Sequence, residues 1–248
     1  MTQNEKTCWL VDLGLIPYGP ACELQRQLVG ARKSGAVPDV LLVCEHPHVI
    51  TLGRNGSREH LRAGDRLLAQ MNVEFHPTDR GGDITYHGPG QIVGYPILDL
   101  TEHRRDVRWY VEQLEEVMIR ASANFGVAAR RVEGRHGVWT GTPRSEEKLG
   151  ALGVHLSRWV TSHGFAYNVS TDLRYFDLIV PCGIAGARAT SLERILSRSM
   201  ACSEVRARLA SHFADIFELA LEQVTRENLA VVLGSPQETA AGALTAMV

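Results

Sequence analysis

The chain has 248 residues, of which 28 are acidic and 26 are basic, and its formal net charge is -2. This length suits one large domain or two small ones, and the balanced charge does not indicate a nucleic acid or an anionic membrane surface as partner. Apolar runs such as residues 40–44 are too short to span a bilayer.

The cysteines and the first residues indicate the compartment. The five cysteines include no CxxC pair, and residues 1–7 are polar, without the apolar core and cleavage pattern of a signal peptide. We therefore expect free thiols and a cytoplasmic location.

Hydrophobic periodicity predicts the helices and strands. Val107, Val111, Leu114 and Met118, for example, fall on one helical face. In chain order, the patterns predict a helix over 21–29, strands over 40–44, 49–52, 73–76 and 92–98, a helix over 107–125, strands over 127–132, 137–139, 148–156 and 160–169, and a helix over 205–224. The last four strands are expected to be antiparallel and joined by short turns. This order indicates a mixed α/β fold with antiparallel sheets rather than regular βαβ alternation.

No linker divides the chain, so residues 1–227 are expected to form one domain. The segment 228–248 is poor in charge after Gly234 and rich in Ala, Gly and Thr. We expect this tail to be partly disordered.

Residues 80–91, with the sequence RGGDITYHGPGQ, are the most informative stretch. Four glycines and a proline exclude a helix interior. Polar side chains set among them, including Arg80 and His87, are typical of a loop whose backbone comes close to a ligand. The apolar run 92–98 that follows would fix this loop to a sheet. The alternative is a long surface turn.

Cys182 is a candidate nucleophile. It lies between Pro181 and Gly183 in a predicted loop, whereas the other cysteines lie in segments typical of a core. Gly183 would allow backbone N–H groups to approach an oxyanion. A nucleophilic thiol also needs a partner that lowers its pKa from about 8.5. The alternative is a buried structural cysteine.

Lys148 is a candidate for that partner. It precedes an apolar run with two glycines, residues 149–154, and a partly desolvated lysine can act as a base or pair with a thiolate. The alternative is the exposed end of a strand. His87 and His163 are further candidates for the same pocket.

Metal and nucleotide sites are not indicated. His46 and His48 form an HxH pair, but no third ligand lies at a suggestive spacing. The chain has no GxxxxGK[ST] loop, no GxGxxG after the first strand and no GxSxG elbow. We therefore predict no metal and no cofactor.

Taken together, these motifs resemble the octanoyl-[acyl-carrier-protein]:protein N-octanoyltransferases of lipoate biosynthesis. Six segments occur in the family's order: 45–47 with 51–54, 80–91, 137–139, 148 with 151–153, 163–169 and 181–184. The chain departs from the family at Leu149-Gly150, at the acidic residues 145–147 and at His155, none of which changes Cys182 or Lys148.

The resemblance implies a fold and a site. The fold would be that of the catalytic domain of lipoate–protein and biotin–protein ligases, with a larger and a smaller mixed or antiparallel β-sheet flanked by helices. Cys182 would be the nucleophile and acyl carrier, and Lys148 would lower the pKa of Cys182 and move protons. The implied substrate-binding residues are Arg80, Gly81, Gly82, Asp83, Ile84, Thr85, Tyr86, His87, Ala151, Leu152, Gly153, Gly164, Phe165 and Ala166.

The implied activity is octanoyl transfer from octanoyl-acyl carrier protein to a lysine ε-amine on lipoyl domains. The acceptors would be the E2 subunits of 2-oxoacid dehydrogenases and the glycine-cleavage H protein, and the enzyme would be a monomer. Because carrier proteins are acidic, the candidates for their contact surface are Arg54, Arg58, Arg62 and Arg66. The alternative is that these arginines form only a solvated face. The nearest alternative is an ATP-dependent lipoate–protein ligase, which needs no nucleophilic cysteine. A biotin–protein ligase, a non-catalytic carrier-binding module and a thioesterase are more distant alternatives.

Overall fold

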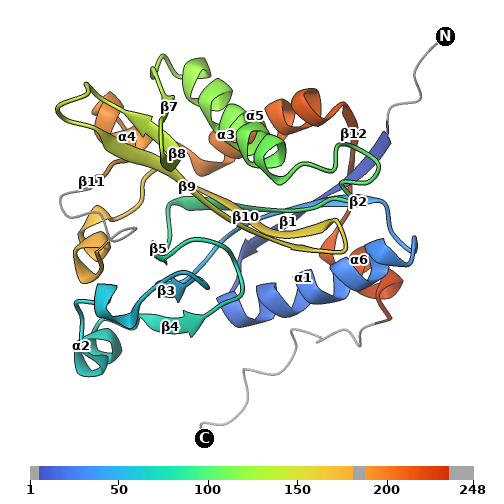
Figure 1. The fold of residues 1–248 in the computed structure, drawn as a ribbon, viewed down its shortest axis with the longest axis horizontal. Helices are drawn as coiled ribbons and strands as arrows, with labels where there is room; N and C mark the ends of the chain where they lie inside the picture. The colour runs from blue at the N-terminus through green and yellow to red at the C-terminus, as the bar shows by residue number, and fades with distance from the viewer. Residues whose placement is uncertain (1–5, 181–187, 235–248) are drawn as a thin grey trace, which may run out of the picture.

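A computed structural model of the chain describes residues 6–180 and 188–234. Within these ranges it has a nine-stranded sheet and a three-stranded sheet, both flanked by helices (Figure 1). This arrangement confirms the predicted mixed α/β fold with a larger and a smaller sheet.

The large sheet is mixed. β1 pairs in parallel with β2 and β12, and β11 pairs in parallel with β9, whereas the other neighbours are antiparallel. Its strands in spatial order are β12 (Leu219–Gln223), β1 (Lys6–Leu15), β2 (Asp39–Glu45), β6 (Gln91–Ile97), β10 (Val160–Asn168), β9 (Glu147–Ser157), β8 (Arg135–Thr140) and β7 (Arg130–Val132), with β11 (Arg188–Ala189) beside β9.

Helices cover both faces of this sheet (Figure 1). On one face, α3 (Val107–Asn124) and α5 (Cys202–Phe217) bury an apolar cluster that includes Leu114 and Phe213. On the other face, α1 (Tyr18–Lys33) and α6 (Arg226–Val232) bury a second cluster that includes Leu28 and Leu229. Burial of each apolar stripe removes it from water and fixes the helix on the sheet.

The small sheet lies beside one end of α1 (Figure 1). β3 (Val49–Leu52) is its central strand, parallel to β4 (Glu74–Pro77) and antiparallel to β5 (Ile84–His87). Its own apolar cluster includes Ile50, Ile84 and Tyr86. The remaining short helices are η1 (Arg58–His60), α2 (Asp65–Gln70), η2 (Leu173–Leu178) and α4 (Leu192–Leu196).

The four strands predicted between residues 127 and 169 are confirmed as antiparallel neighbours β7 to β10. β9 and β10 form a long hairpin that crosses the centre of the molecule (Figure 1). Its turn residues Arg158 and Trp159 have φ of 52° and 68°, as a two-residue hairpin turn that matches the strand twist requires.

Two predictions about elements were wrong, and one strand was missed. The helix predicted over 205–224 ends at Phe217, where Glu218 has a left-handed φ of 55°, and residues 219–223 form β12. β1 at the N-terminal end was not predicted. The stretch 80–91 is not one loop, because residues 84–87 pair with β3 as β5.

The segment expected as a tail begins inside α6, whose Leu229 is 1% exposed. Among the described residues, none of the helices is both long enough and apolar enough to cross a membrane.

Candidate active site

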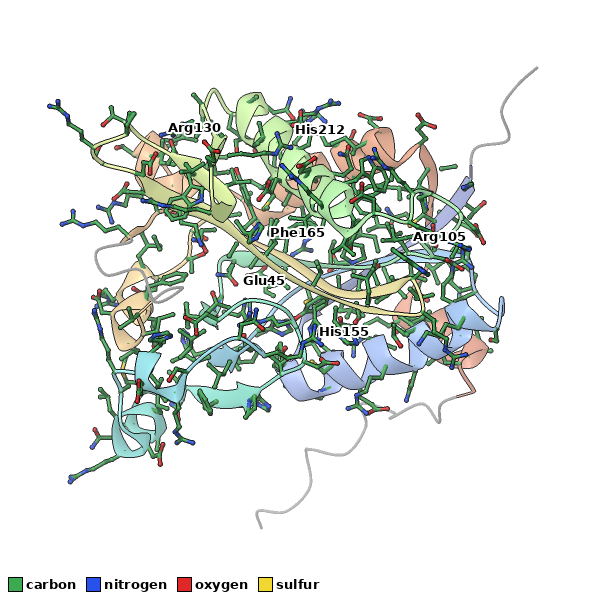
Figure 2. All side chains as sticks on the ribbon, in the orientation of Figure 1. Glu45, Arg105, Arg130, His155, Phe165 and His212 are labelled. Atoms are coloured by element: carbon green, nitrogen blue, oxygen red, sulfur yellow. The ribbon has the colours of Figure 1, made fainter. Side chains whose placement is uncertain are left out.

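A cavity of about 530 Å³ lies where the small sheet meets the central strands of the large sheet. This volume falls in the range of small-molecule sites. Phe165, on β10 at the centre of the molecule (Figure 2), forms part of the wall. Of the residues predicted from the sequence, the following line the cavity: Arg80, Gly81, Gly82, Asp83, Ile84, Thr85, His87, Lys148, Ala151, Leu152, Gly153, Gly164, Phe165 and Ala166.

Tyr86 is placed elsewhere. Successive side chains of a strand point to opposite faces, and Tyr86 lies on the face of β5 opposite to Thr85 and His87. It is fully buried in the core of the small sheet, where its hydroxyl is 2.8 Å from His48 Nδ1 and its ring stacks on Tyr175. Tyr86 therefore does not line the cavity, and that it binds substrate stays a prediction.

Cys182 and its neighbours Pro181 and Gly183 lie outside the described residues. The described chain ends before them at Val180, whose N–H donates to His60 O at 2.7 Å. It resumes at β11, where Arg188 pairs with Glu147 and Ala189 pairs with Lys148, and both β11 residues line the cavity.

Lys148 lies near the start of β9, directly across from Trp139 on β8. Its Nζ is 4.7 Å from the centroid of the buried Trp139 ring, a distance typical of a cation–π contact. Gly137 lies beside it, since a Cβ there would come within 3.5 Å of Lys148 Cε. The N–H of Gly137 donates to buried Glu115 Oε1 at 2.9 Å. Strand pairing and the aromatic ring thus position the amine, and the α3 carboxylate holds the neighbouring Gly137.

Arg80 is buried and anchors the glycine-rich stretch to β3. Its Nη2 donates to Thr51 O at 2.8 Å and to Thr51 Oγ1 at 2.9 Å. Gly81 N donates to Val154 O at 2.9 Å, and a Cβ on Gly153 would lie 2.6 Å from Gly81 O. Because Gly153 has no side chain, the backbone of β9 can pack directly against the backbone at Gly81. This glycine therefore serves the packing of the cavity wall.

His87 is a buried neutral imidazole. Its Nδ1 is 2.7 Å from Gln91 Oε1. Burial, and next the charge on His46, lower the pKa of His87 to about 3, against the opposing effect of the bond to Gln91. At neutral pH this ring therefore carries no charge.

His163 also lines the cavity, as expected. It has a left-handed φ of 55°, and its backbone N–H donates to Gln25 Oε1 at 2.8 Å. Its Nε2 is 2.7 Å from Asp79 Oδ1. Burial lowers the pKa of His163, although the hydrogen bond to Asp79 acts in the opposite direction. A strained backbone held by a buried glutamine is typical of a functional site.

Several cavity residues were not predicted as site residues. Gln91, Trp139 and Asn168 occur in motifs on which the resemblance rests, so the sequence could have indicated them as site residues. Tyr18, Val107 and Phe176 come from segments without such a signal, and only the fold brings them to the wall. The further lining residues are Asn55, Val93, Tyr95, Val111, Gly134, Arg135, His136, Val154, Arg188 and Ala189.

Neither a metal nor a reactive thiol is indicated by the described residues. Within the described ranges, no three His, Cys, Asp or Glu side chains converge as metal ligands would. Cys8, Cys22, Cys44 and Cys202 are free, and burial raises the pKa of each of these thiols.

Comparisons with known proteins agree on one family. The family model described as the lipoyl protein ligase A/B catalytic domain matches residues 17–214. An octanoyltransferase of Solibacter usitatus is 52% identical over 216 residues, which is 87% of this chain and 96% of the relative. An octanoyltransferase of Acidobacterium capsulatum is 55% identical over 193 residues, 74% of this chain and 78% of the relative.

Solved structures are similar in fold. A bi-partite lipoate protein ligase from Thermoplasma acidophilum superposes with a TM-score of 0.72 at 16% identity, over 92% of this chain and 91% of that chain. A lipoate-protein ligase A bound with ATP gives 0.71 at 15% identity, over 93% of each chain. At these identities the likeness establishes the fold alone.

Proposed function

We propose that this member of the lipoyl protein ligase A/B catalytic-domain family, an octanoyltransferase, moves octanoate in two steps through Cys182. An octanoyltransferase is an acyltransferase. The donor is octanoyl-acyl carrier protein, and the acceptors are lysines on the lipoyl domains of 2-oxoacid dehydrogenase E2 subunits and on the glycine-cleavage H protein. The observation that carries this proposal is the pairing of β11 with β9. It returns the chain that follows Cys182 to the strand of Lys148, at the cavity wall.

In the first step, the Cys182 thiolate attacks the donor's thioester carbonyl. The carrier's phosphopantetheine thiolate leaves and takes a proton from the Lys148 ammonium. One thioester replaces another, so the step is close to isoenergetic and needs no ATP.

In the second step, the acceptor lysine's neutral ε-amine attacks the carbonyl of the acyl-enzyme. Its extra proton passes to the Lys148 amine, and the Cys182 thiolate leaves. The amide product is more stable than the thioester, which drives the transfer. Lys148 thus returns to the ammonium form and Cys182 to the thiolate.

The cavity supports an acyl substrate. Ile84, Val93, Leu152, Val154 and Phe165 line it. Burial of six methylene groups at about 0.8 kcal/mol each would contribute about 5 kcal/mol to binding, enough to select for chain length.

The experiment is intact-mass measurement after mixing the protein with octanoyl-acyl carrier protein in the absence of ATP. We expect one octanoyl adduct in the wild type, sensitive to hydroxylamine, and loss of the thioester in Cys182→Ser. Cys202→Ser is the matched control, because it removes a half-buried thiol outside the cavity wall, and it should keep the adduct. A wild type without adduct, or a thioester that persists in Cys182→Ser, would overturn the mechanism.

The ATP-dependent ligase reaction is the alternative that the shared fold permits. It is tested by adding free octanoate or lipoate, ATP and an acceptor lipoyl domain. Turnover only with ATP, and none with the octanoyl carrier protein, would favour the ligase.

Lys148 is tested separately. The alkylation rate of Cys182 by iodoacetamide is measured against pH. Because the neighbouring ammonium favours the thiolate, the midpoint of this profile should move to higher pH in Lys148→Ala. An unchanged alkylation profile would reject this part of the mechanism.

A further inference from the structure

A chain of side-chain amides runs from His87 to the strand that carries Lys148. His87 Nδ1 is 2.7 Å from Gln91 Oε1, and Gln91 Nε2 is 2.9 Å from Asn168 Oδ1. Asn168 Nδ2 in turn donates to Thr190 O at 2.9 Å, and Thr190 N donates to Lys148 O at 2.9 Å. His87, Gln91, Asn168 and Lys148 all line the cavity.

Two backbone carbonyl oxygens fix the direction of the hydrogen bonds that link His87, Gln91 and Asn168. A carbonyl oxygen only accepts. Tyr86 O, 3.1 Å from Gln91 Nε2, therefore requires the amide nitrogen of Gln91 on that side, and Thr190 O requires the same of Asn168. Flipping either amide would oppose two oxygens. The amide orientations thus follow from acceptor-only partners.

The tautomer of His87 follows from these orientations. Gln91 presents its oxygen to the ring, so His87 Nδ1 carries the proton and donates it. The other ring nitrogen, Nε2, is then an acceptor, with Thr51 Oγ1 at 3.5 Å. Since Arg80 donates twice to Thr51 Oγ1, the hydroxyl proton of Thr51 is available to point at His87 Nε2.

We infer that Gln91 and Asn168 are positioning residues of the acyl transfer: they hold His87 in the Nδ1–H tautomer, with Nε2 as an acceptor, and join it to the backbone of Lys148. This inference rests on the proposed function for its kinetic part only. Both amides are nearly fully buried, at 2% and 5% exposure, so loss of one partner would leave a polar group in the core without a hydrogen bond.

The consequence for the reaction concerns direction. At Nε2 the neutral His87 ring can only accept a hydrogen bond, and Thr51 Oγ1 is the donor beside it. His87 therefore has no proton at Nε2 to give to a leaving thiol, so proton transfer belongs to Lys148.

The test is the tautomer of His87 in the free protein at neutral pH, measured from the ¹⁵N shifts of labelled histidine. The His87 signals are assigned by their disappearance in His87→Gln. We expect a protonated Nδ1 in the wild type and a mixed tautomer in Gln91→Met, which removes the acceptor opposite Nδ1. In Gln91→Met we also expect kcat for octanoyl transfer to fall about ten-fold or more, with a smaller change in KM.

Asn124→Leu is the matched control. Its Oδ1 is 2.6 Å from His212 Nε2 at the exposed end of α3, so the substitution removes another amide–imidazole hydrogen bond outside the cavity wall. It should leave the His87 tautomer and kcat unchanged. A wild-type His87 protonated at Nε2 would overturn the inference even if no variant folds. A Gln91→Met protein that folds and keeps the wild-type tautomer or kcat would also overturn it. Failure of the proposed function would show instead as no acyl transfer by the wild type, with the tautomer unaffected.

Discussion

Lys148 and Trp139 are cross-strand partners, and the amine of Lys148 lies over the indole ring at 4.7 Å from its centroid. Arg135 precedes Trp139 on the same strand, β8, and its Cζ lies 5.5 Å from the centroid of the same ring. The ring thus contacts two cations, and both Lys148 and Arg135 line the cavity.

Removing the ring should slow acyl transfer. A cation–π contact contributes about 0.5–2 kcal/mol, so Trp139→Leu is expected to lower the single-turnover rate about 2- to 30-fold, and Trp139→Phe is expected to lower it less. Arg108→Ala, which removes an exposed arginine that pairs with Glu112 and does not line the cavity, should keep the rate. Wild-type rates in both Trp139 variants would show that Lys148 is held by other contacts.

His87 should make stability depend on pH. Its pKa falls from 6.5 to about 3 in the folded protein, so between these values the unfolded imidazole binds a proton that the folded one does not. The free energy of unfolding should therefore decrease as pH falls from 6.5, by up to about 1.4 kcal/mol per pH unit from this residue. In urea unfolding at pH 7, 6, 5 and 4, His87→Asn should show a shallower decrease than the wild type. Parallel curves for His87→Asn and the wild type would contradict the expectation.

The exposed arginines near α2 should bind the acidic donor. Arg62 and Arg66 are exposed, and no ion pair engages either of them within the described part of the chain. We expect Arg62→Glu with Arg66→Glu to raise the KM for octanoyl carrier protein several-fold and to weaken its dependence on salt. Arg105→Glu is the control, because Arg105 lies at the opposite end of the molecule from α2 (Figure 1 and Figure 2). Equal KM values in all three proteins would remove this surface from the donor site.

Two glycines should respond in opposite ways to the same substitution. In Gly153→Ala the new Cβ would lie 2.6 Å from Gly81 O, so we expect about 1–3 kcal/mol lower stability and weaker acyl transfer. Gly30 is an exposed residue of α1, and no atom lies within 4 Å of a Cβ built there. Gly30→Ala should therefore raise the free energy of unfolding by about 0.5–1 kcal/mol. Urea unfolding of both variants checks the two signs.

The elements that the sequence predicts well are those whose signal is local. The antiparallel strands from β7 to β10 and helix α3 follow from nearby periodicity. Helix α5 was extended too far because Leu221 and Val224 continue its apolar spacing. What ends it is the parallel pairing of β12 with β1, which lies more than 200 positions earlier in the chain, and such a contact has no local signature.

The same distinction applies to the site. Lys148 and the glycine-rich stretch lie in motifs, and both reach the cavity wall. Tyr86 lies in the same stretch but faces the core, because a strand inside the motif alternates its side chains. Tyr18 and Phe176 reach the wall only through the packing of α1 and η2, so no pattern in their own segments indicates them.

The burial of the four described cysteines bears on how the protein could be targeted. Because the environment of Cys8, Cys22, Cys44 and Cys202 disfavours the thiolate of each, an electrophile applied at neutral pH would find little competition from them. A mild covalent reagent with an eight-carbon tail should therefore modify Cys182 in preference to these four cysteines. That selectivity would come from the scaffold and not from the reagent.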